Sequence, residues 1–142
     1  MSIKATAYEL QAFMQTEFPQ ATITVEQVDE QEVWVRQPVD ESHLRPGGTV
    51  SGPTMMATAD TAAYVVVLSS IGIVPLAVTS NLNINFLRKP ESGKALLARG
   101  TLLHLGRRSV LTEVNIYSEG HLQKPVAHAV VTYAVPSSHS QA

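Results

Sequence analysis

The sequence predicts an α+β fold, and three observations point to it. Residues 53–71 are apolar on nearly every side, as a helix buried inside a fold would be. Four β-like runs follow this segment and are separated by turn-forming residues; they span 77–87, 95–105, 109–118 and 126–135. At 142 residues and 44% apolar content, the chain is long enough to bury a core. We therefore expect one domain over residues 1–142, with an antiparallel sheet wrapped around the central helix.

The elements before the central helix are expected to be short. Apolar residues lie mostly three to five positions apart in residues 5–18, which predicts an amphipathic helix that ends near Pro19, within residues 1–19. Two strand-like pieces follow at 21–28 and 31–37. Residues 38–52 are rich in proline and glycine and are expected to form a long loop.

The central helix is expected to begin at Pro53 and to stop at Gly72. Proline fits the first turn of a helix because its missing N–H would have no partner there, and glycine is the common stop. The segment is apolar enough to suggest a membrane span, but Asp60, Gly72 and Pro75 favour a buried helix.

The four later runs are expected to form hairpin-linked strands. Within the first, Thr79 and three asparagines alternate with Ser80, Leu82, Ile84 and Phe86, and the second set is expected to pack on the helix. The last residues, 137–142, are expected to fray.

Composition excludes several classes of protein. The chain has no cysteine, so it has no disulfide, cysteine nucleophile or thiolate metal site, and no histidine pair has metal-ligand spacing, so we expect no metal. A net charge of −2 predicts no general affinity for nucleic acid. Only 15% of the residues are charged, which suggests that surface is hidden in an oligomer. The start of the chain lacks the apolar run of a signal peptide, which predicts a cytoplasmic protein that does not associate with membranes.

The charges that are present are distributed unevenly. Residues 1–60 carry three Lys or Arg and nine Asp or Glu, whereas residues 88–142 carry seven and three. This asymmetry allows a local anion site in the second half, and it equally fits a mixed solvated surface.

Asp60 is the one Asp, Glu, Lys or Arg between Pro46 and Leu87. It lies about two turns into the predicted buried helix, where an ionised carboxylate needs a partner or a task. It could serve as a general base or a nucleophile, or it could be a structural residue satisfied by hydroxyls such as those of Thr58 or Thr61. The glycine-rich segment before the helix leads to free N–H groups that can hold an anion or an oxyanion.

Four separated motifs resemble those of hotdog-fold acyl-CoA thioesterases of the phenylacetate-degradation, or PaaI-like, type. The run Gly-Thr-Val-Ser-Gly-Pro-Thr-Met-Met-Ala-Thr-Ala-Asp ends at Asp60 and resembles the His-Gly-Gly signature with its acidic residue nine positions after the His. Ala-Val-Thr-Ser-Asn-Leu-Asn-Ile-Asn-Phe-Leu-Arg-Lys-Pro, from Ala77, resembles a family strand. Gly106-Arg-Arg and Pro125-Val-Ala-His-Ala resemble two further strand motifs, so the likeness covers roughly residues 20–136.

The resemblance implies hydrolysis of acyl-CoA thioesters by a hotdog domain that works as a homodimer or a dimer of dimers. It makes Asp60 the catalytic carboxylate and the Gly52 N–H the oxyanion donor, while Thr79 would place the water from across the dimer interface. The phosphates of coenzyme A, which is part of the substrate and not a separate cofactor, would bind near four basic residues: Arg88, Lys89, Arg107 and Arg108.

This chain departs from the family pattern at three positions. Ser51 replaces the family's His, Pro53 replaces its second Gly, and Arg45 stands where the family has Asn. Serine can still hydrogen-bond a thioester oxygen, but it cannot carry a positive charge. Arg45 could bind a substrate carboxylate or face solvent, and Tyr64 and Met56 could line the acyl pocket or fill the core. A binding or sensing protein that lost efficient catalysis therefore stays open as an alternative.

Overall fold

The computed structural model describes residues 3–136, which contain two α-helices, one short 3-10 helix and six β-strands. The elements in chain order are α1 (Ala7–Glu17), β1 (Thr24–Val28), β2 (Val33–Gln37), the 3-10 turn η1 (Glu41–His43), α2 (Gly52–Ile71), β3 (Val78–Phe86), β4 (Leu96–Leu105), β5 (Ser109–Ser118) and β6 (Ala127–Ala134). The tail at 137–142, expected to fray, lies outside the described residues.

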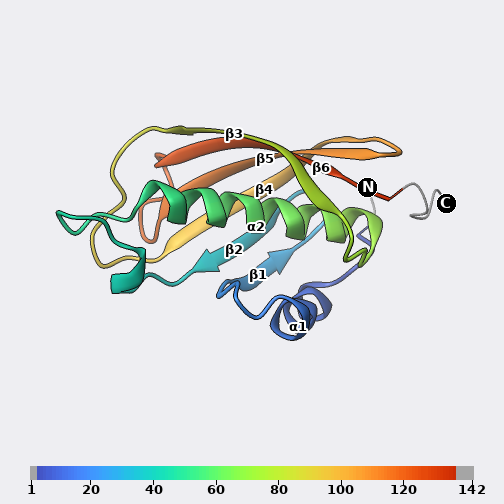
Figure 1. Cartoon of the computed structure of the whole chain (residues 1–142), viewed down its shortest axis with the longest axis horizontal. Coiled ribbons are helices and arrows are strands. Elements are labelled where there is room, and N and C mark those ends of the chain that lie inside the picture. Colours follow the sequence, from blue (N-terminus) through green and yellow to red (C-terminus); the bar gives the residue numbers. More distant parts are fainter. Residues whose placement is uncertain (1–2, 137–142) are drawn as a thin grey trace.

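The six strands form one antiparallel sheet, and α2 lies across one face of it (Figure 1). The strand order is β1-β2-β4-β5-β6-β3. Alternate residues of β2, β4, β5 and β6 are buried, and these residues pack on α2. A long helix held against an antiparallel sheet is the arrangement expected from the sequence, so the α+β hotdog fold is confirmed.

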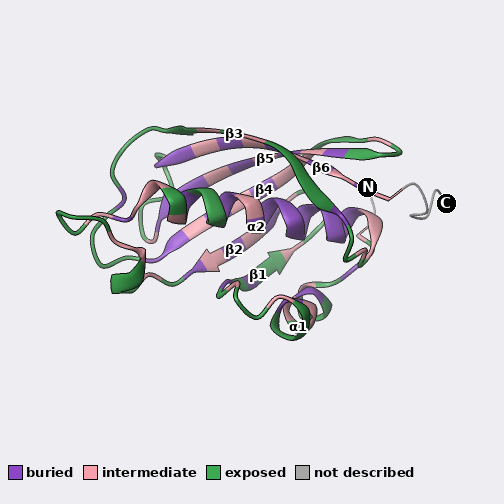
Figure 2. Ribbon diagram, in the orientation of Figure 1, coloured by how far each residue is buried: buried purple, intermediate pink, exposed green. Residues whose placement is uncertain are grey.

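Helix α2 begins at Gly52, one residue earlier than predicted, and its capping residue is Ser51. It stops at Gly72, whose φ of 95° is a conformation that glycine adopts without strain. Burial increases along the helix, and Figure 2 shows exposed residues in its first turns and buried ones beyond. By length and composition α2 could cross a membrane, but 67% of that span is buried inside the fold, which fits a core helix.

The tight contact between α2 and β4 depends on Gly100. A Cβ built at Gly100 would lie 2.6 Å from Cγ2 of Val66, closer than two carbon atoms can approach. Its φ is not positive, so the requirement for glycine here comes from space and not from backbone conformation.

Helix α1 is set by a capping box, in which the side chains of Thr6 and Glu9 each accept a hydrogen bond from the backbone of the other. Leu10 and Met14 are buried. The Val25 N–H donates to Oε1 of Gln11 at 2.6 Å, which ties α1 to β1. The amphipathic helix predicted within residues 1–19 is therefore present, at the edge of the sheet nearest β1.

The prediction of four hairpin-linked strands is wrong for β3. Among the four strands after α2, only β4–β5 and β5–β6 are consecutive pairs, while β3 pairs with β6 and the chain then crosses the sheet to reach β4. The link over residues 87–95 contains Pro90 and is long enough for this crossing, unlike a tight turn. As a result β3 is an edge strand, and one of its edges has no strand partner within residues 3–136.

Candidate active site

Asp60 lies on the side of α2 that faces β3 and β6. Its Oδ1 accepts a hydrogen bond from Thr79 Oγ1 at 2.6 Å and another from the Tyr133 hydroxyl at 3.0 Å. The Thr58 and Thr61 hydroxyls do not reach it, because each donates to the carbonyl one turn back in α2. Asp60 is half-buried, not buried as the sequence predicts, since its carboxylate stands at the margin of a hollow.

A β-bulge aims Thr79 at this carboxylate. Thr79 pairs with Tyr133 and Asn81 pairs with Thr132, so Ser80 is the extra residue in β3. Strict alternation would place Thr79 on the outer face with the asparagines; the bulge turns it to the inner face instead. Of the set expected to pack on the helix, Leu82 and Ile84 do so, whereas Ser80 is exposed.

Thr79 and Asp60 meet within one chain. The family resemblance implied that Thr79 acts from across a dimer interface, and that role stays a prediction. The bulge brings the Thr79 hydroxyl onto the helix of its own chain.

The hollow beside Asp60 has a volume of about 450 Å³ and a largely aromatic wall. Tyr64 stacks on Tyr133 with ring centroids 5.6 Å apart, and Phe13 and Phe18 of the α1 segment pack around Tyr64. Burial raises the pKa of the Tyr64 hydroxyl, so it stays neutral. Tyr64, which the sequence offered as pocket or core, lines the hollow, and Glu17 is the other acidic group there.

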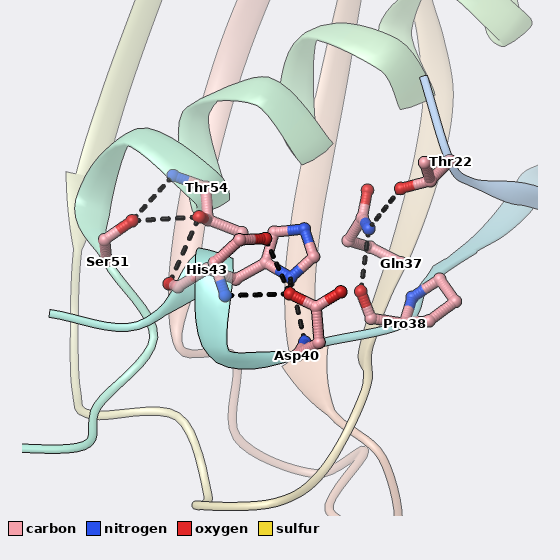
Figure 3. Close-up of polar contacts among 8 residues, drawn as sticks. Thr22, Gln37, Pro38, Asp40, His43, Ser51 and Thr54 are labelled. Atoms are coloured by element: carbon pink, nitrogen blue, oxygen red, sulfur yellow. Dashed lines mark hydrogen bonds and ion pairs between the residues drawn. The ribbon is translucent and has the colours of Figure 1, made fainter. Parts of the chain in front are cut away.

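The start of α2 forms the second part of the site (Figure 3). The Thr54 N–H donates to Ser51 Oγ at 3.2 Å, and the two hydroxyls are 2.9 Å apart. Thr54 Oγ1 also donates to the His43 carbonyl at 3.3 Å, so Ser51 supplies the hydrogen between the two hydroxyls. Ser51 therefore acts as the helix cap. The Gly52 N–H has no hydrogen-bond partner within the described residues.

A hollow of about 330 Å³ adjoins this helix start. It brings together four of the predicted site residues: Arg45, Gly52, Arg88 and Lys89. Met55 lines it, whereas Met56, the predicted pocket residue, is absent from its wall and 41% exposed, because the helical turn directs Met56 away from the sheet.

Arg88 and Lys89 also line a larger hollow of about 600 Å³ with His121 and Lys124. The two adjoining hollows thus form a basic surface, in which the Arg88 guanidinium donates to the Pro125 carbonyl. Arg107 and Arg108 are not part of it. They lie in the β4–β5 turn, next to Ser109, which pairs with Ala134 at the far end of the sheet.

Sequence reasoning missed Tyr133. It lies 73 positions from Asp60, and its alternation with small apolar residues in β6 is typical of a core residue. The available signal was that a buried tyrosine hydroxyl needs a partner. Within residues 3–136, no group of three or more His, Asp or Glu side chains could hold a metal ion.

Comparison with known proteins places this site in a family context. The thioesterase superfamily model matches residues 47–124. A protein from Silicibacter sp. TM1040, described as a candidate thioesterase, is 41% identical and superposes with a TM-score of 0.88, covering 96% of this chain and 95% of its own. No protein with curated annotation matches the chain.

Two more distant structures share the fold. A mutant of the phenylacetic acid degradation protein PaaI from Thermus thermophilus is 26% identical, with a TM-score of 0.70 over 88% of this chain and 99% of its own. A Streptococcus mutans UA159 protein bound to acetyl-CoA is 25% identical, with a TM-score of 0.70 over 84% of this chain and 92% of its own. From the family match, the 41% identity and the shared architecture it follows that this chain belongs to the thioesterase superfamily.

Proposed function

We propose that this protein hydrolyses acyl-CoA thioesters to the free acid and coenzyme A, with Asp60 as general base or nucleophile. The observation that carries the proposal is the state of the Asp60 carboxylate. Two hydroxyls hold Oδ1, while Oδ2 has no partner within the described residues, and Asp60 is one of the residues that line the hollow. A carboxylate fixed by one oxygen presents the other to water or to a carbonyl carbon. The acetyl-CoA bound by the Streptococcus mutans relative supports a CoA thioester as substrate.

The proposed working unit is a homodimer. Gly52 and Asp60 are eight residues apart on one straight helix, so the oxyanion donor and the carboxylate are about 12 Å apart along its axis. One thioester carbonyl cannot contact both in a single chain. A second copy supplies the missing half if the free edges of β3 pair antiparallel, because the Asp60 end of one chain then meets the Gly52 end of the other.

The exposed surface of β3 supports this pairing. Its free edge is nine residues long, and Val78 and Phe86 at its two ends are 58% and 49% exposed. A long edge strand with unpaired N–H and C=O groups is a template for pairing with another chain.

The chemistry in such a composite site uses the start of α2 from one chain and Asp60, two turns further along the helix, from the other. Attack on the carbonyl carbon, by water whose proton goes to Asp60 or by Asp60 itself, places negative charge on the carbonyl oxygen. The Gly52 N–H and the positive end of the helix dipole stabilise that oxyanion. The C–S bond then breaks and coenzyme A leaves as the thiolate, which takes the proton held by Asp60 in the general-base route or a proton from solvent in the nucleophilic route. In the nucleophilic route water then hydrolyses the acyl-enzyme anhydride to regenerate Asp60.

The basic surface beside Gly52 is the proposed site for the coenzyme A phosphates. Arg45, Arg88 and Lys89 stand between the oxyanion donor and the larger hollow that holds Lys124. An extended ligand anchored at Gly52 would pass these cations. Arg107 and Arg108, at the other end of the sheet, would come near only from the partner chain.

A second candidate function is an acyl-CoA binding or sensing protein with weak catalysis. The occupation of Ser51 as helix cap favours it, because this hydroxyl is not free to polarise a thioester oxygen. Pro53 also removes a donor from the first turn.

The deciding experiment is thiol release from a panel of aliphatic and aromatic acyl-CoAs, comparing wild type with Asp60→Asn. We expect turnover with at least one class and a loss of at least about a hundredfold in kcat for the variant, because an amide neither accepts a proton nor attacks a carbonyl. The matched control is Asp29→Asn, in an exposed turn where the amide oxygen can still accept from the backbone N–H groups of Gln31 and Glu32.

Either part of the result can contradict the proposal. Turnover that survives in Asp60→Asn removes Asp60 from the mechanism. An inactive wild type that binds coenzyme A would instead establish the binding protein.

A further inference from the structure

We infer that Tyr133 is the positioning residue that holds the Asp60 carboxylate in place, so that one carboxylate oxygen is fixed and the other is left without a partner. The inference rests on the proposed role of Asp60 and adds a residue to that site. Three observations on the described residues carry it.

The first observation is the geometry of the Tyr133 hydroxyl. It lies 3.0 Å from Oδ1 and 3.1 Å from the backbone carbonyl oxygen of Asp60, so its one hydrogen is directed at this residue alone. Thr79 bonds the same Oδ1 from the other strand, at 2.6 Å. Both donors converge on one oxygen because β3 and β6 pair at the positions of Thr79 and Tyr133.

The second observation is that the Tyr133 ring cannot move away. The residue is 4% exposed, and its ring stacks on Tyr64, whose own ring is packed by Phe13 and Phe18. A hydroxyl on an immobile ring is a directional donor, and it loses little entropy when it holds a carboxylate. Thr79, by contrast, is exposed and lies at the bulge of an edge strand.

The third observation is that Tyr133 stays a donor. Burial, and after it the charge of Asp60, raises the pKa of the Tyr133 phenol, so the hydroxyl keeps its hydrogen at any physiological pH. The titratable groups that line the hollow with Asp60 are Glu17 of α1, Tyr64 of α2 and Tyr133 of β6. Among these, Tyr133 alone is bonded to the carboxylate.

The test is Tyr133→Phe, which keeps the stacked ring and removes the hydroxyl. We expect kcat on the best acyl-CoA to fall about ten- to a hundredfold with KM within about twofold, the effect of losing one hydrogen bond to a charged group. A residue that only supports packing would not confine the loss to kcat in this way.

A second readout needs no turnover. In protein labelled with 13C at aspartate carboxyls, three signals arise, from Asp29, Asp40 and Asp60; the Asp60→Asn variant assigns the third. Tyr133→Phe should change the chemical shift of that signal, because its carboxylate loses a hydrogen bond, and leave the other two signals unchanged. The matched control is Tyr117→Phe, another buried tyrosine, whose ring packs on Trp34 away from the site.

The two readouts distinguish a failure of this inference from a failure of the proposed function. If the Asp60 signal has the same chemical shift in wild type, Tyr133→Phe and Tyr117→Phe, the inference is overturned even where acyl-CoAs are hydrolysed. If no acyl-CoA is hydrolysed but the Asp60 signal moves only in Tyr133→Phe, the link between Tyr133 and Asp60 holds and the proposed function fails.

Discussion

Ser51 occupies the position at which the related signature has histidine, and its hydroxyl serves the backbone. It accepts a hydrogen bond from the Thr54 N–H and donates one to the Thr54 hydroxyl. The free Gly52 N–H next to it depends on this geometry, because the cap fixes where the first turn of α2 begins. The Ser51 hydroxyl therefore affects the proposed oxyanion donor, the Gly52 N–H, indirectly, by fixing the backbone at the start of α2.

Ser51→Ala should reveal this structural role. Loss of an N-cap costs about 1 kcal/mol, which lowers the Tm of a domain of this size by roughly 2–4 °C. Calorimetry measures the change, and Ser51→Asp is the control because a carboxylate caps the helix and suits its positive end. If Ser51→Ala abolishes thiol release with an unchanged Tm, the hydroxyl acts on the substrate and not as a cap.

The residues at the site were only partly predictable from the sequence. Asp60 stands out because it is the single charge in a long apolar stretch, and Gly52 because it starts the helix. The contacts of Asp60 could not be predicted, since they depend on a bulge at Ser80 and on the pairing of two strands about 50 residues apart. Neither feature leaves a local pattern.

Among the elements, the strands and helices were predicted to within three residues at each end, while their neighbours in the sheet were not. Hydrophobic alternation marks a strand but does not say which strand it pairs with. Strand β3 precedes β4 in the chain, yet it pairs with β6 and becomes an edge. Because β3 pairs with β6 and not with β4, the strand that carries Thr79 has a free edge close to Asp60.

Asn83→Glu tests whether that edge is the interface of the proposed dimer. Asn83 is exposed near the middle of β3, so antiparallel pairing of two β3 edges brings both copies close to the symmetry axis, where like charges repel. We expect sedimentation to show that the variant dissociates at higher protein concentrations than wild type does. Thiol release should fall in parallel. Asn115→Glu, on central strand β5, is the control. An unchanged dimer in Asn83→Glu would place the interface elsewhere.

Gly100→Ala tests the contact between β4 and α2. The new methyl would stand 2.6 Å from Cγ2 of Val66, so we expect a loss of about 1–3 kcal/mol in the free energy of unfolding by urea. Val66→Ala removes the obstructing methyl, and the double variant should be more stable than the sum of the two single changes predicts. If the changes in unfolding free energy were strictly additive, residues 100 and 66 would not interact.

At the scale of the whole molecule, two positions along α2 have different surroundings. Gly52, at the start of the helix, adjoins a basic surface, and Asp60, two turns further along, lines a hollow with several aromatic side chains. The proposed site joins Gly52 of one chain to Asp60 of its partner, so every dimer would contain two identical sites.

Subunit mixing tests this arrangement. Gly52→Pro removes the N–H donor at a helical position that tolerates proline, and Asp60→Asn removes the carboxylate. Each variant alone should be inactive, while an equal mixture refolded together should regain roughly a quarter of wild-type activity, because half the dimers carry one intact site. Gly52→Ala, which keeps the N–H and places its Cβ about 3.5 Å from the Phe86 ring, should stay active. An inactive mixture would place both groups in one chain.

The distance along the chain between β3 and β6 has a consequence for synthesis. Strand β3 is complete at residue 86, but its partner begins only at Ala127, some 40 residues later. A ribosome therefore releases β3 well before the strand that pairs with it, so the edge of β3 that bonds to β6 stays unpaired during that interval, and unpaired strand edges are prone to aggregation. A translation product that stalls before residue 133 contains Asp60 and Thr79 but not Tyr133. The pair of hydroxyls that hold the Asp60 carboxylate is therefore completed only near the end of synthesis.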